Sequence, residues 1–457
     1  MLRRWFIPVI VLAGLAGRNA VTALLVPAGD GDLGWQHWLG AQILRGGLPH
    51  ALGAESFAAA GAPWVPQEWL FSALLAVAGV HGAGWLFALA VGLCAALALA
   101  CVGLRCARNG ADPVAVALVL VFVDMAMAQS FGVRVQVVAW ALLAAFLLAL
   151  DLPPRHRWTA VVVAVIWANV HASAMLAPLL AGAAAVGSAF ARDRRSAVHD
   201  AILALGCAAA VCATPLGTTL PEYAFALMRS PIRDWIHEWH RTAFTDPAFA
   251  LGTLPVMVLA VVAVRRASWR SLALAAPFGY LAFAAVRNVP LAAIACAPLA
   301  ASALTALLPS LASFRPYAGR ALAAAGLALV FAGASTVTAL GARYAQDDRP
   351  LLAIHELTRL PGRHRLFCED FAWCGLALDT GTIGVFVDGR ADPYPIEVWR
   401  QYDTVLHARA GWRPILRRYG VDAMLVRRDR ALDRAAQRGG WRIVRDGPTR
   451  LLVAQKA

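Results

Sequence analysis

The sequence predicts an α-helical, polytopic membrane protein with one small α/β domain at its C-terminal end. Of the 457 residues, 60% are hydrophobic and only 15% are charged, whereas soluble domains are usually about 25% charged. Apolar runs of about 18 or more residues are typical of transmembrane helices, and they recur before residue 344. From residue 345 the chain is charged and has no such run. We therefore predict a membrane domain at 1–344 and a soluble domain at 345–457.

The membrane domain contains about eleven apolar spans. They run near residues 5–26, 82–104, 113–130, 133–150, 158–171, 173–190, 200–216, 249–264, 271–286, 289–308 and 321–341. Several are shorter than a bilayer requires, and such helices usually line a cavity rather than lipid. The segment Glu68–Val80 is apolar but too short to span. We expect it to lie along the interface or to lead into the second span.

The arginines predict the orientation. The net charge is +14, and alternate short loops carry Arg3, Arg4, Arg105, Arg108, Arg155, Arg157, Arg192, Arg194, Arg195, Arg265, Arg266, Arg270, Arg315 and Arg320. By the positive-inside rule these loops and the N-terminus are cytoplasmic. The loops at 27–70 and 215–248, and everything after about Tyr344, then face outward. Arginines clustered in this way indicate membrane topology, with lipids as neighbours, rather than nucleic-acid binding.

The outward C-terminal region alternates strand and helix patterns. Strands are predicted at 364–368, 383–387, 423–426, 441–444 and 451–454, and helices at 350–359, 396–407, 412–419 and 429–438. This alternation is typical of a small α/β domain. Cys368 and Cys374 can form a short-loop disulfide if the compartment is oxidising. No CxxC, HExxH or GxxxxGK[ST] pattern occurs, so neither a P-loop nucleotide site nor a Cys or His metal site is indicated.

The polar stretch 27–70 holds the carboxylates best placed for chemistry. Asp30 and Asp32 form a D-x-D pair just outside the first span. Such a pair can hold a divalent cation, or one member can act as a base while the other tunes it. Alternatively, Asp32 caps the helix predicted over Leu33–Arg45, and the two roles can coexist. Glu68 is a third candidate, although it also suits a helix start for dipole reasons.

Aromatic residues and one histidine accompany these carboxylates. The tryptophans of the stretch are Trp35, Trp38, Trp64 and Trp69. Their faces could stack on sugar rings while Glu68 accepts sugar hydroxyls. His37 could contact a phosphate or a sugar hydroxyl. The alternative for the tryptophans is aromatic anchoring at the membrane interface.

Polar residues also gather at the outward ends of short spans. They are Arg134, Gln136, Asn169, His171, Arg287 and Asn288. Ionisable residues at membrane depth are costly and usually functional, so we expect one shared cavity. Arg134 and Arg287 would suit a lipid-linked phosphate, which guanidinium binds in bidentate fashion. They could instead snorkel to the interface. Arg18 lies inside the first span and needs a partner that the sequence does not identify.

A second wall of this cavity is predicted in the loop at 215–248. Trp235, Glu238 and Trp239 are spaced i, i+3 and i+4, which places them on one face of a helix. A plain interfacial helix is the alternative interpretation.

The segment Asp388-Gly-Arg390-Ala-Asp392 follows a predicted strand in the outward domain. Residues at the carboxyl end of a strand in an α/β sheet commonly face a ligand crevice. Either the three charged residues form a structural ion-pair knot, or the loop caps the cavity with Arg390 or Asp392 on the acceptor.

Together these motifs resemble a bacterial family of membrane proteins with glycosyltransferase C-type (GT-C) architecture, related to protein O-mannosyltransferases and lipid A aminoarabinose transferases. They are Asp30-Gly-Asp32-Leu-Gly-Trp35-Gln36-His37, Pro63-Trp64 to Glu68-Trp69-Leu70, Arg134-Val-Gln136, Trp167-Ala-Asn169-Val-His171, Arg287-Asn288-Val-Pro290 and Asp388 to Tyr394. The resemblance covers nearly the whole chain. Two positions depart from the pattern. Gln36 is inserted into the Trp-His pair, and Gln67 stands where a histidine is expected, which weakens a metal site there.

The resemblance implies a polyprenyl-phosphate sugar as donor and the cytoplasmic membrane as location. It assigns the base to Asp32, with Asp30 second, and leaves a divalent cation possible. In such a reaction a carboxylate takes the acceptor proton, Arg134 or Arg287 offsets charge on the leaving phosphate, and a single displacement inverts the anomeric carbon. The competing interpretation is a non-enzymatic membrane protein, either a glycan-lipid carrier or an envelope assembly partner. The sequence shows no internal repeat of the kind expected in a transporter, which disfavours that interpretation.

Overall fold

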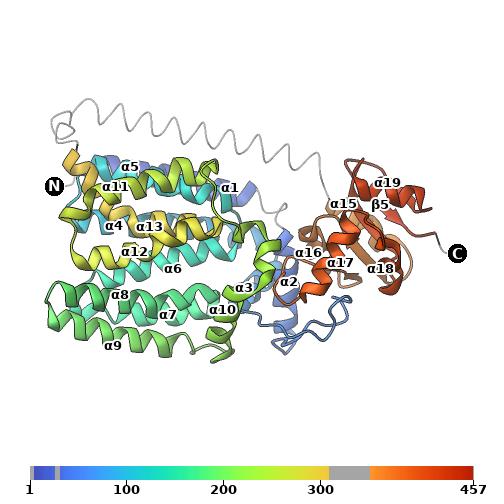
Figure 1. Cartoon of the computed structure of the whole chain (residues 1–457), viewed down its shortest axis with the longest axis horizontal. Helices are drawn as coiled ribbons and strands as arrows, with labels where there is room; N and C mark the ends of the chain where they lie inside the picture. The colour runs from blue at the N-terminus through green and yellow to red at the C-terminus, as the bar shows by residue number, and fades with distance from the viewer. Residues whose placement is uncertain (1–4, 26–30, 308–349, 456–457) are drawn as a thin grey trace. The chain divides into compact units, whose positions relative to one another are not determined.

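A computed structural model describes residues 5–25, 31–307 and 350–455. The eleventh predicted span, at 321–341, lies outside these residues. The described chain forms two compact units (Figure 1). The bundle unit comprises residues 5–25, 88–228 and 236–307, and the sheet unit comprises residues 31–87, 229–235 and 350–455. The predicted boundary near residue 344 stays a prediction, because it concerns the membrane, which contacts within the chain do not report.

The bundle unit is built from helices. They are α1 (Phe6–Leu25), α4 (Gly84–Arg108), α5 (Pro113–Met127), α6 (Val135–Leu150), α7 (Thr159–Val170), α8 (Leu176–Phe190), α9 (Arg194–Ala210), α10 (Thr219–Arg229), α11 (Leu254–Ala263), α12 (Trp269–Ala284) and α13 (Val289–Leu307). In the described part of the chain, 5 helical stretches are long and apolar enough to cross a membrane. They are Phe6–Leu24, Gly84–Arg108, Ala172–Phe190, Phe249–Arg266 and Val286–Leu307. The described residues therefore contain several helices able to cross a membrane, as a multi-pass protein requires. The number of eleven spans stays a prediction.

Helix α13 lies at the centre of the bundle unit. It packs against α5, α6, α11 and α12. In the most apolar stretch of 18 residues within Val286–Leu307, 72% of the residues are buried. Its buried positions are largely alanine, from Ala292 and Ala293 to Ala300 and Ala301. Small side chains let helix backbones approach closely, which is how helices associate where water supplies no hydrophobic drive.

Helix α1 is tied to α5 by a buried ion pair. Nη2 of Arg18 lies 2.6 Å from Oδ2 of Asp124, whose side chain is 1% exposed. Asn19 completes the group, because it donates to Oδ1 of Asp124 and accepts from Arg18. Asp124 is the partner that the sequence could not identify for Arg18.

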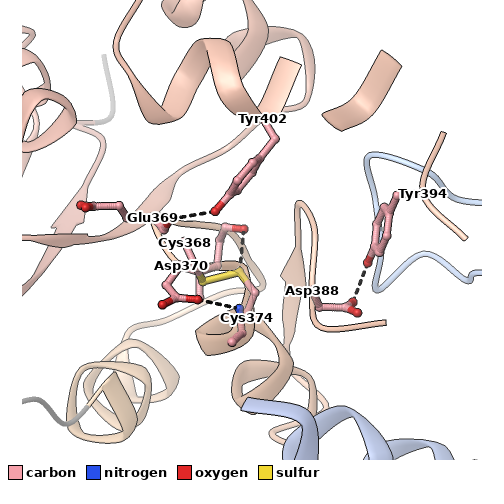
Figure 2. Close-up of a disulfide and its surroundings, with 9 residues drawn as sticks. Cys368, Glu369, Asp370, Cys374, Asp388, Tyr394 and Tyr402 are labelled. Carbon is pink, nitrogen blue, oxygen red and sulfur yellow. Dashed lines mark hydrogen bonds between the residues drawn. A yellow bond between two sulfur atoms is a disulfide. The ribbon is translucent and has the colours of Figure 1, made fainter. Parts of the chain in front are cut away.

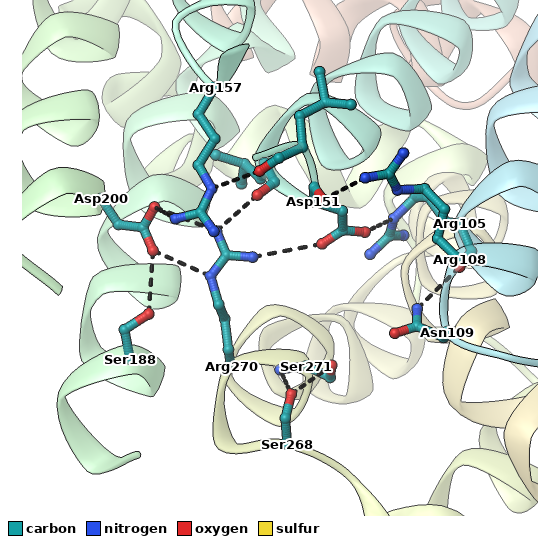
Figure 3. A network of polar contacts seen from close by, with 12 residues as sticks. Arg105, Arg108, Asn109, Asp151, Arg157, Ser188, Asp200, Ser268, Arg270 and Ser271 are labelled. Carbon is teal, nitrogen blue, oxygen red and sulfur yellow. Dashed lines mark hydrogen bonds and ion pairs between the residues drawn. The ribbon is translucent and has the colours of Figure 1, made fainter. Parts of the chain in front are cut away.

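A second ion-pair network joins the ends of α4, α6, α9 and α12, which the positive-inside rule predicts to be cytoplasmic. Figure 3 shows Asp151 and Asp200 surrounded by arginines. Asp151 pairs with Arg105 at 2.8 Å and with Arg270 at 3.5 Å. Asp200, which is fully buried, pairs with Arg157 at 3.0 Å and with Arg270 at 3.1 Å. The arginines that predict topology therefore also hold four helices together.

The sheet unit contains a mixed five-stranded sheet in the order β2-β1-β3-β5-β4. The strands are β1 (His364–Cys368), β2 (Ile383–Val385), β3 (Ala423–Arg427), β4 (Arg442–Arg445) and β5 (Thr449–Val453). Strand β1 pairs in parallel with β2 and β3, and β5 is antiparallel to β3 and β4. The five strands lie close to their predicted positions. The helices of this unit are α2 (Gly31–Leu44), α3 (Trp69–Val80), α15 (Pro350–Arg359), α16 (Phe371–Leu378), α17 (Ile396–Leu406), α18 (Trp412–Arg418) and α19 (Ala431–Arg438).

Two glycines let α2 pack between α3 and α16. A Cβ atom on Gly34 would overlap the backbone of Gly375 in α16, and one on Gly40 would overlap the backbone of Ser72 in α3. The first polar stretch of the chain thus folds onto the sheet that the last hundred residues build. A disulfide between Cys368 and Cys374, with Cα atoms 5.8 Å apart, fixes α16 to the end of β1 (Figure 2).

The buried Arg18–Asp124 pair generates an asymmetric prediction. Breaking a buried pair costs about 3–5 kcal/mol when one charge is left behind. Asp124 without Arg18 can take up a proton, whereas Arg18 without Asp124 stays charged. We expect melting temperatures to fall in the order wild type, Arg18→Leu, Asp124→Leu, with the double variant above both single variants. Calorimetry of the full chain in detergent measures this order. A double variant less stable than Asp124→Leu would contradict it.

Candidate functional site

Asp32 lies in the first turn of α2 and is partly exposed. Its Oδ1 accepts a hydrogen bond from Nε1 of Trp35 at 3.0 Å, one turn along the same helix. The position suits a carboxylate, because the amino-terminal end of a helix carries a partial positive charge. Asp30, the other member of the D-x-D pair, lies outside the described residues.

The turn after β2 comes directly against Asp32. A Cβ atom on Gly389 would overlap Oδ1 of Asp32 and would lie 3.0 Å from Nε1 of Trp35. The two ends of the sequence motif set, residues 30–37 and 388–394, therefore meet inside the sheet unit.

Arg390 is the centre of this contact. Its Nε donates to Oδ1 of Asp388 at 2.9 Å and its Nη2 donates to Oδ2 at 2.6 Å. Both side chains are fully buried. The guanidinium carbon lies 4.8 Å from the ring centroid of Trp64 and 5.1 Å from that of Trp38, and Nη2 also donates to Ser56. Burial is the largest influence and lowers the pKa of Arg390, but the charges of Asp388, Tyr394 and Glu55 and the hydrogen bond to Asp388 together outweigh it, so the pKa of the guanidinium lies above its usual value.

Further contacts make the turn rigid. The hydroxyl of Tyr394 donates to Oδ2 of Asp388 at 2.5 Å (Figure 2), and burial, followed by the Asp388 charge, raises the pKa of Tyr394. Ala391 has φ 54°, a left-handed backbone that costs a residue with a Cβ about 1–2 kcal/mol. Asp388 and Arg390 thus form the ion-pair knot, which is one of the two interpretations of this motif.

Asp392 is joined to the knot through backbone, because its amide donates to the carbonyl of Arg390 at 2.6 Å. It is partly exposed and lines a cavity of about 340 Å³. The other lining residues are mostly apolar: Ala62, Pro63, Ser230, Pro231, Ile232, Pro393, Tyr394, Pro395 and Ile396. Of the three charged residues of the motif, Asp392 is the one placed where a ligand could reach it.

Glu68 is buried and held by two amides. Nε2 of Gln36 donates to Oε2, and Nε2 of Gln67 donates to Oε1 at 2.7 Å. These are the two positions at which the sequence departs from the family pattern, so both departures serve one carboxylate. An acceptor-only side chain satisfied in this way is well suited to hold α2 against the start of α3. Of the two candidate carboxylates Asp32 and Glu68, Asp32 is the more accessible.

The aromatic residues pack rather than present open faces. Trp64 is 5% exposed and contacts Trp35 edge to face and Trp38 in a stacked arrangement, both at 6.4 Å between centroids. Trp69 is the first residue of α3. His37 is bonded to Asp379 at 2.5 Å, and this hydrogen bond raises the pKa of His37.

In the bundle unit, a short segment engages both candidate phosphate ligands. Nη1 of Arg134 lies 2.8 Å from Oε1 of Glu238, and the guanidinium of Arg287 stacks on Trp239 with its carbon 4.3 Å from the ring centroid. Arg287 is close enough for its charge to act on His171. The structure thus groups Arg134, Glu238, Trp239, Arg287 and His171.

The predicted single helix through Trp235, Glu238 and Trp239 is wrong. Pro231–Trp235 and His237–Trp239 are separate 3₁₀ turns, and Ile236 between them is extended, with φ −111° and ψ 115°. The side-chain contacts explain the break. Trp235 packs on Trp399 within the sheet unit, whereas Glu238 and Trp239 contact Arg134 and Arg287 within the bundle unit.

The remaining polar residues at the span ends bind backbone. Asn169 donates to the carbonyls of Val165 and Ala213, and Asn288 donates to that of Leu281 at the end of α12. His171 accepts from the backbone of Ser173. Gln136 lies in the first turn of α6. The contacts of Asn169 and Asn288 lie at the ends of α7 and α12, and that of Asn288 holds the segment that carries Arg287.

A metal site was tested against the same geometry. Within residues 5–25, 31–307 and 350–455, no group of three or more His, Cys, Asp or Glu side chains could hold a metal ion. Asp32 accepts a hydrogen bond from Trp35, and Glu68 accepts from Gln36 and Gln67. Asp30 lies outside the described residues, so a divalent cation at the D-x-D pair stays a prediction, and we derive no step through one.

Comparison with known proteins identifies the fold. No protein-family model matches the sequence, and no curated protein matches it. Among solved structures, the oligosaccharyltransferase AglB from Archaeoglobus fulgidus, in complex with an inhibitory peptide and a dolichol-phosphate, has a TM-score of 0.62 at 10% identity, covering 91% of this chain and 69% of AglB. ArnT from Cupriavidus metallidurans, bound to undecaprenyl phosphate, has a TM-score of 0.58 at 14% identity, covering 98% of this chain and 99% of ArnT.

A further structure of the Archaeoglobus fulgidus oligosaccharyltransferase, complexed with Zn and sulfate, has a TM-score of 0.55 at 12% identity, covering 91% of this chain and 68% of that one. These similarities show that the chain has the GT-C fold, as the sequence motifs predict. At these identities they define the fold and leave the activity to be argued from the residues.

The buried knot generates a stability prediction. Arg390→Ala leaves Asp388 buried without its counter-charge, at a cost of about 3 kcal/mol or more, so we expect a melting temperature several degrees lower. Arg390→Lys, which keeps the charge but loses the bidentate geometry, should lie in between. Arg400→Ala is the matched control, since Arg400 is 66% exposed and pairs with exposed Glu397. An unchanged melting temperature for Arg390→Ala would favour the lid interpretation.

Proposed function

We propose that this chain is a membrane glycosyltransferase that moves a sugar from a polyprenyl-phosphate donor to an extracytoplasmic acceptor. The observation that carries the proposal is Asp32 in a GT-C fold. It is a partly exposed carboxylate at the start of the first helix after the first span, oriented by Trp35 and by the turn at Gly389. AglB and ArnT, which share the fold, were solved with dolichol-phosphate and undecaprenyl phosphate.

The proposed reaction is a single displacement. The Asp32 carboxylate takes the proton of the acceptor hydroxyl as the oxygen attacks the anomeric carbon. The bond from that carbon to the phosphate oxygen breaks, and its electron pair leaves with the polyprenyl phosphate. The product keeps the new glycosidic bond with inverted configuration, and the proton remains on Asp32 until it passes to solvent.

The second requirement is to stabilise the negative charge that develops on the leaving phosphate, and we assign this role to Arg134 and Arg287. Each guanidinium contacts a side chain of the segment Glu238–Trp239. Glu238 supplies an anion to Arg134, and Trp239 covers the face of Arg287. A phosphate with three acceptor oxygens could replace Glu238 while Trp239 keeps Arg287 in place.

We further propose a bacterial cytoplasmic membrane as the location, with the sheet unit outside. The arginine distribution supports an N-terminus in the cytoplasm. The disulfide between Cys368 and Cys374 supports an oxidising compartment for the sheet unit, since disulfides are rare in the cytosol.

Removal of the base tests the reaction. We expect Asp32→Asn to lower turnover about 100-fold or more, because the amide cannot accept the proton, while the protein stays folded and inserted. The full chain is expressed in bacteria, and polyprenyl-phosphate sugars and envelope glycans are quantified by mass spectrometry. Wild type should deplete one lipid-linked sugar and Asp32→Asn should not. Asp429→Asn is the control, because Asp429 is 74% exposed. Full depletion by Asp32→Asn would place the base elsewhere, with Glu68 next.

Donor binding is measured separately. We expect Arg134→Ala and Arg287→Ala each to weaken undecaprenyl phosphate binding about tenfold, the value of one charged hydrogen bond. Native mass spectrometry of the detergent-purified chain measures it, with undecaprenol as the ligand that lacks phosphate. Arg265→Ala, an exposed arginine in the predicted cytoplasmic loop after α11, should bind as wild type does. Equal affinity for undecaprenol and undecaprenyl phosphate would contradict the assignment. Intact binding without turnover in wild type would favour a carrier.

A further inference from the structure

The turn after β2 has room for a glycine and for nothing larger at residue 389. The backbone of Gly389 is outside the left-handed region, so its conformation is open to any residue. What excludes a side chain is space, since a Cβ would overlap Oδ1 of Asp32 and approach Nε1 of Trp35 to 3.0 Å. The Asp32 carboxylate is therefore enclosed by an indole donor and a piece of backbone from the far end of the chain.

The turn can act as a fixed wall because its neighbours on both sides are held. Asp388 and Arg390 are joined by two hydrogen bonds and are fully buried. The guanidinium of Arg390 lies over Trp38 and Trp64, and Trp38 belongs to α2, the helix that carries Asp32. The amide of Val385 also donates to the carbonyl of Glu55 at 2.7 Å, so the first loop and β2 are joined through backbone.

The opposite face of α2 is equally constrained. Gly34 lets α2 contact the backbone of α16, and α16 is linked to β1 by the disulfide. Helix α2 therefore cannot shift away from the turn without disturbing the sheet. The remaining freedom is in the Asp32 side chain itself, and the Gly389 backbone restricts it.

We infer that Gly389, in the turn fixed by Arg390 and Asp388, is a positioning residue that sets the orientation of the Asp32 carboxylate. The inference rests on the proposed role of Asp32 as base, and it makes the sheet unit part of the transfer reaction. Gly389 touches no reacting atom. It acts by leaving the space beside the turn that Oδ1 of Asp32 occupies, within hydrogen-bond distance of Nε1 of Trp35.

The test replaces Gly389 with alanine and measures three quantities. Because Asp32 is short and partly exposed, its carboxylate can swing outward, so the fold should survive with a melting temperature close to that of wild type. A displaced base about 1 Å from its place can cost about 100-fold in rate, so depletion of the lipid-linked sugar should fall at least tenfold. The indole N–H resonance of Trp35, assigned with Trp35→Phe in protein labelled with ¹⁵N-tryptophan, should move as its hydrogen bond to Asp32 is lost.

Matched variants separate the possible explanations. Gly447→Ala is the control for the substitution itself, since a Cβ there meets only the carbonyl oxygen of Thr449 at 3.5 Å, an ordinary contact, and it should leave all three readouts unchanged. Gly389→Ala and Trp35→Phe should be strongly non-additive in rate when combined, because both act through the same carboxylate.

The outcomes distinguish this inference from the proposed function. If Asp32→Asn is inactive but Gly389→Ala depletes the donor at the wild-type rate, the positioning role is overturned and the base assignment stands. A melting temperature of Gly389→Ala lowered as far as that of Arg390→Ala would show a structural role instead. If Asp32→Asn keeps full turnover, the proposed role of Asp32 as base fails and the positioning role fails with it. An unmoved Trp35 resonance in Gly389→Ala would overturn the contact itself.

Discussion

The guanidinium of Arg390 is fully buried and charged. Asp388 neutralises it as an ion pair, and it lies over the rings of Trp38 and Trp64. Removing this charge from water costs free energy, and only contacts of good geometry offset that cost. The buried charge is therefore stable only while its neighbours keep their positions. Those neighbours come from α2, from the loop before α3 and from the end of β2. One ion pair therefore fixes α2 and the loop that follows it to a turn more than 300 residues later in the sequence, and the orientation of Asp32 depends on that arrangement.

Much of the fold is predictable from residue patterns, and the reasons are local. The strands β1 and β3 and the helices α15 and α17 have clear periodicity, and they begin where the pattern begins. Helix α16 is missed because it has eight residues, almost all apolar, and so lacks a polar face that would reveal a helical period. The two 3₁₀ turns between Pro231 and Trp239 are mistaken for one helix because the spacing of Trp235, Glu238 and Trp239 satisfies the helical rule, although the backbone at Ile236 is extended.

The candidate site can be predicted only in part from residue patterns. Residue type identifies Asp32, Arg134 and Arg287, because a carboxylate after a span and an arginine at membrane depth are each unusual. The pairings are not readable, since Asp124 with Arg18, Glu238 with Arg134 and Asp32 with Gly389 are all long-range contacts. One signal was available in the departures from the family pattern. Gln36 and Gln67 occur together, and two amides appearing together beside Glu68 are what one buried carboxylate needs.

The close contacts of α2 at Gly34 and Gly40 have a consequence for the order in which the protein folds during synthesis. Helix α2 leaves the ribosome early, but α16 and the turn at Gly389 follow more than 300 residues later. At 5–20 residues per second that interval is on the order of tens of seconds. During that time Trp35, Trp38 and Trp64 have no sheet to cover them, and the membrane interface is where indoles rest most easily. The region around Asp32 is thus assembled last, after the rest of the chain has been synthesised.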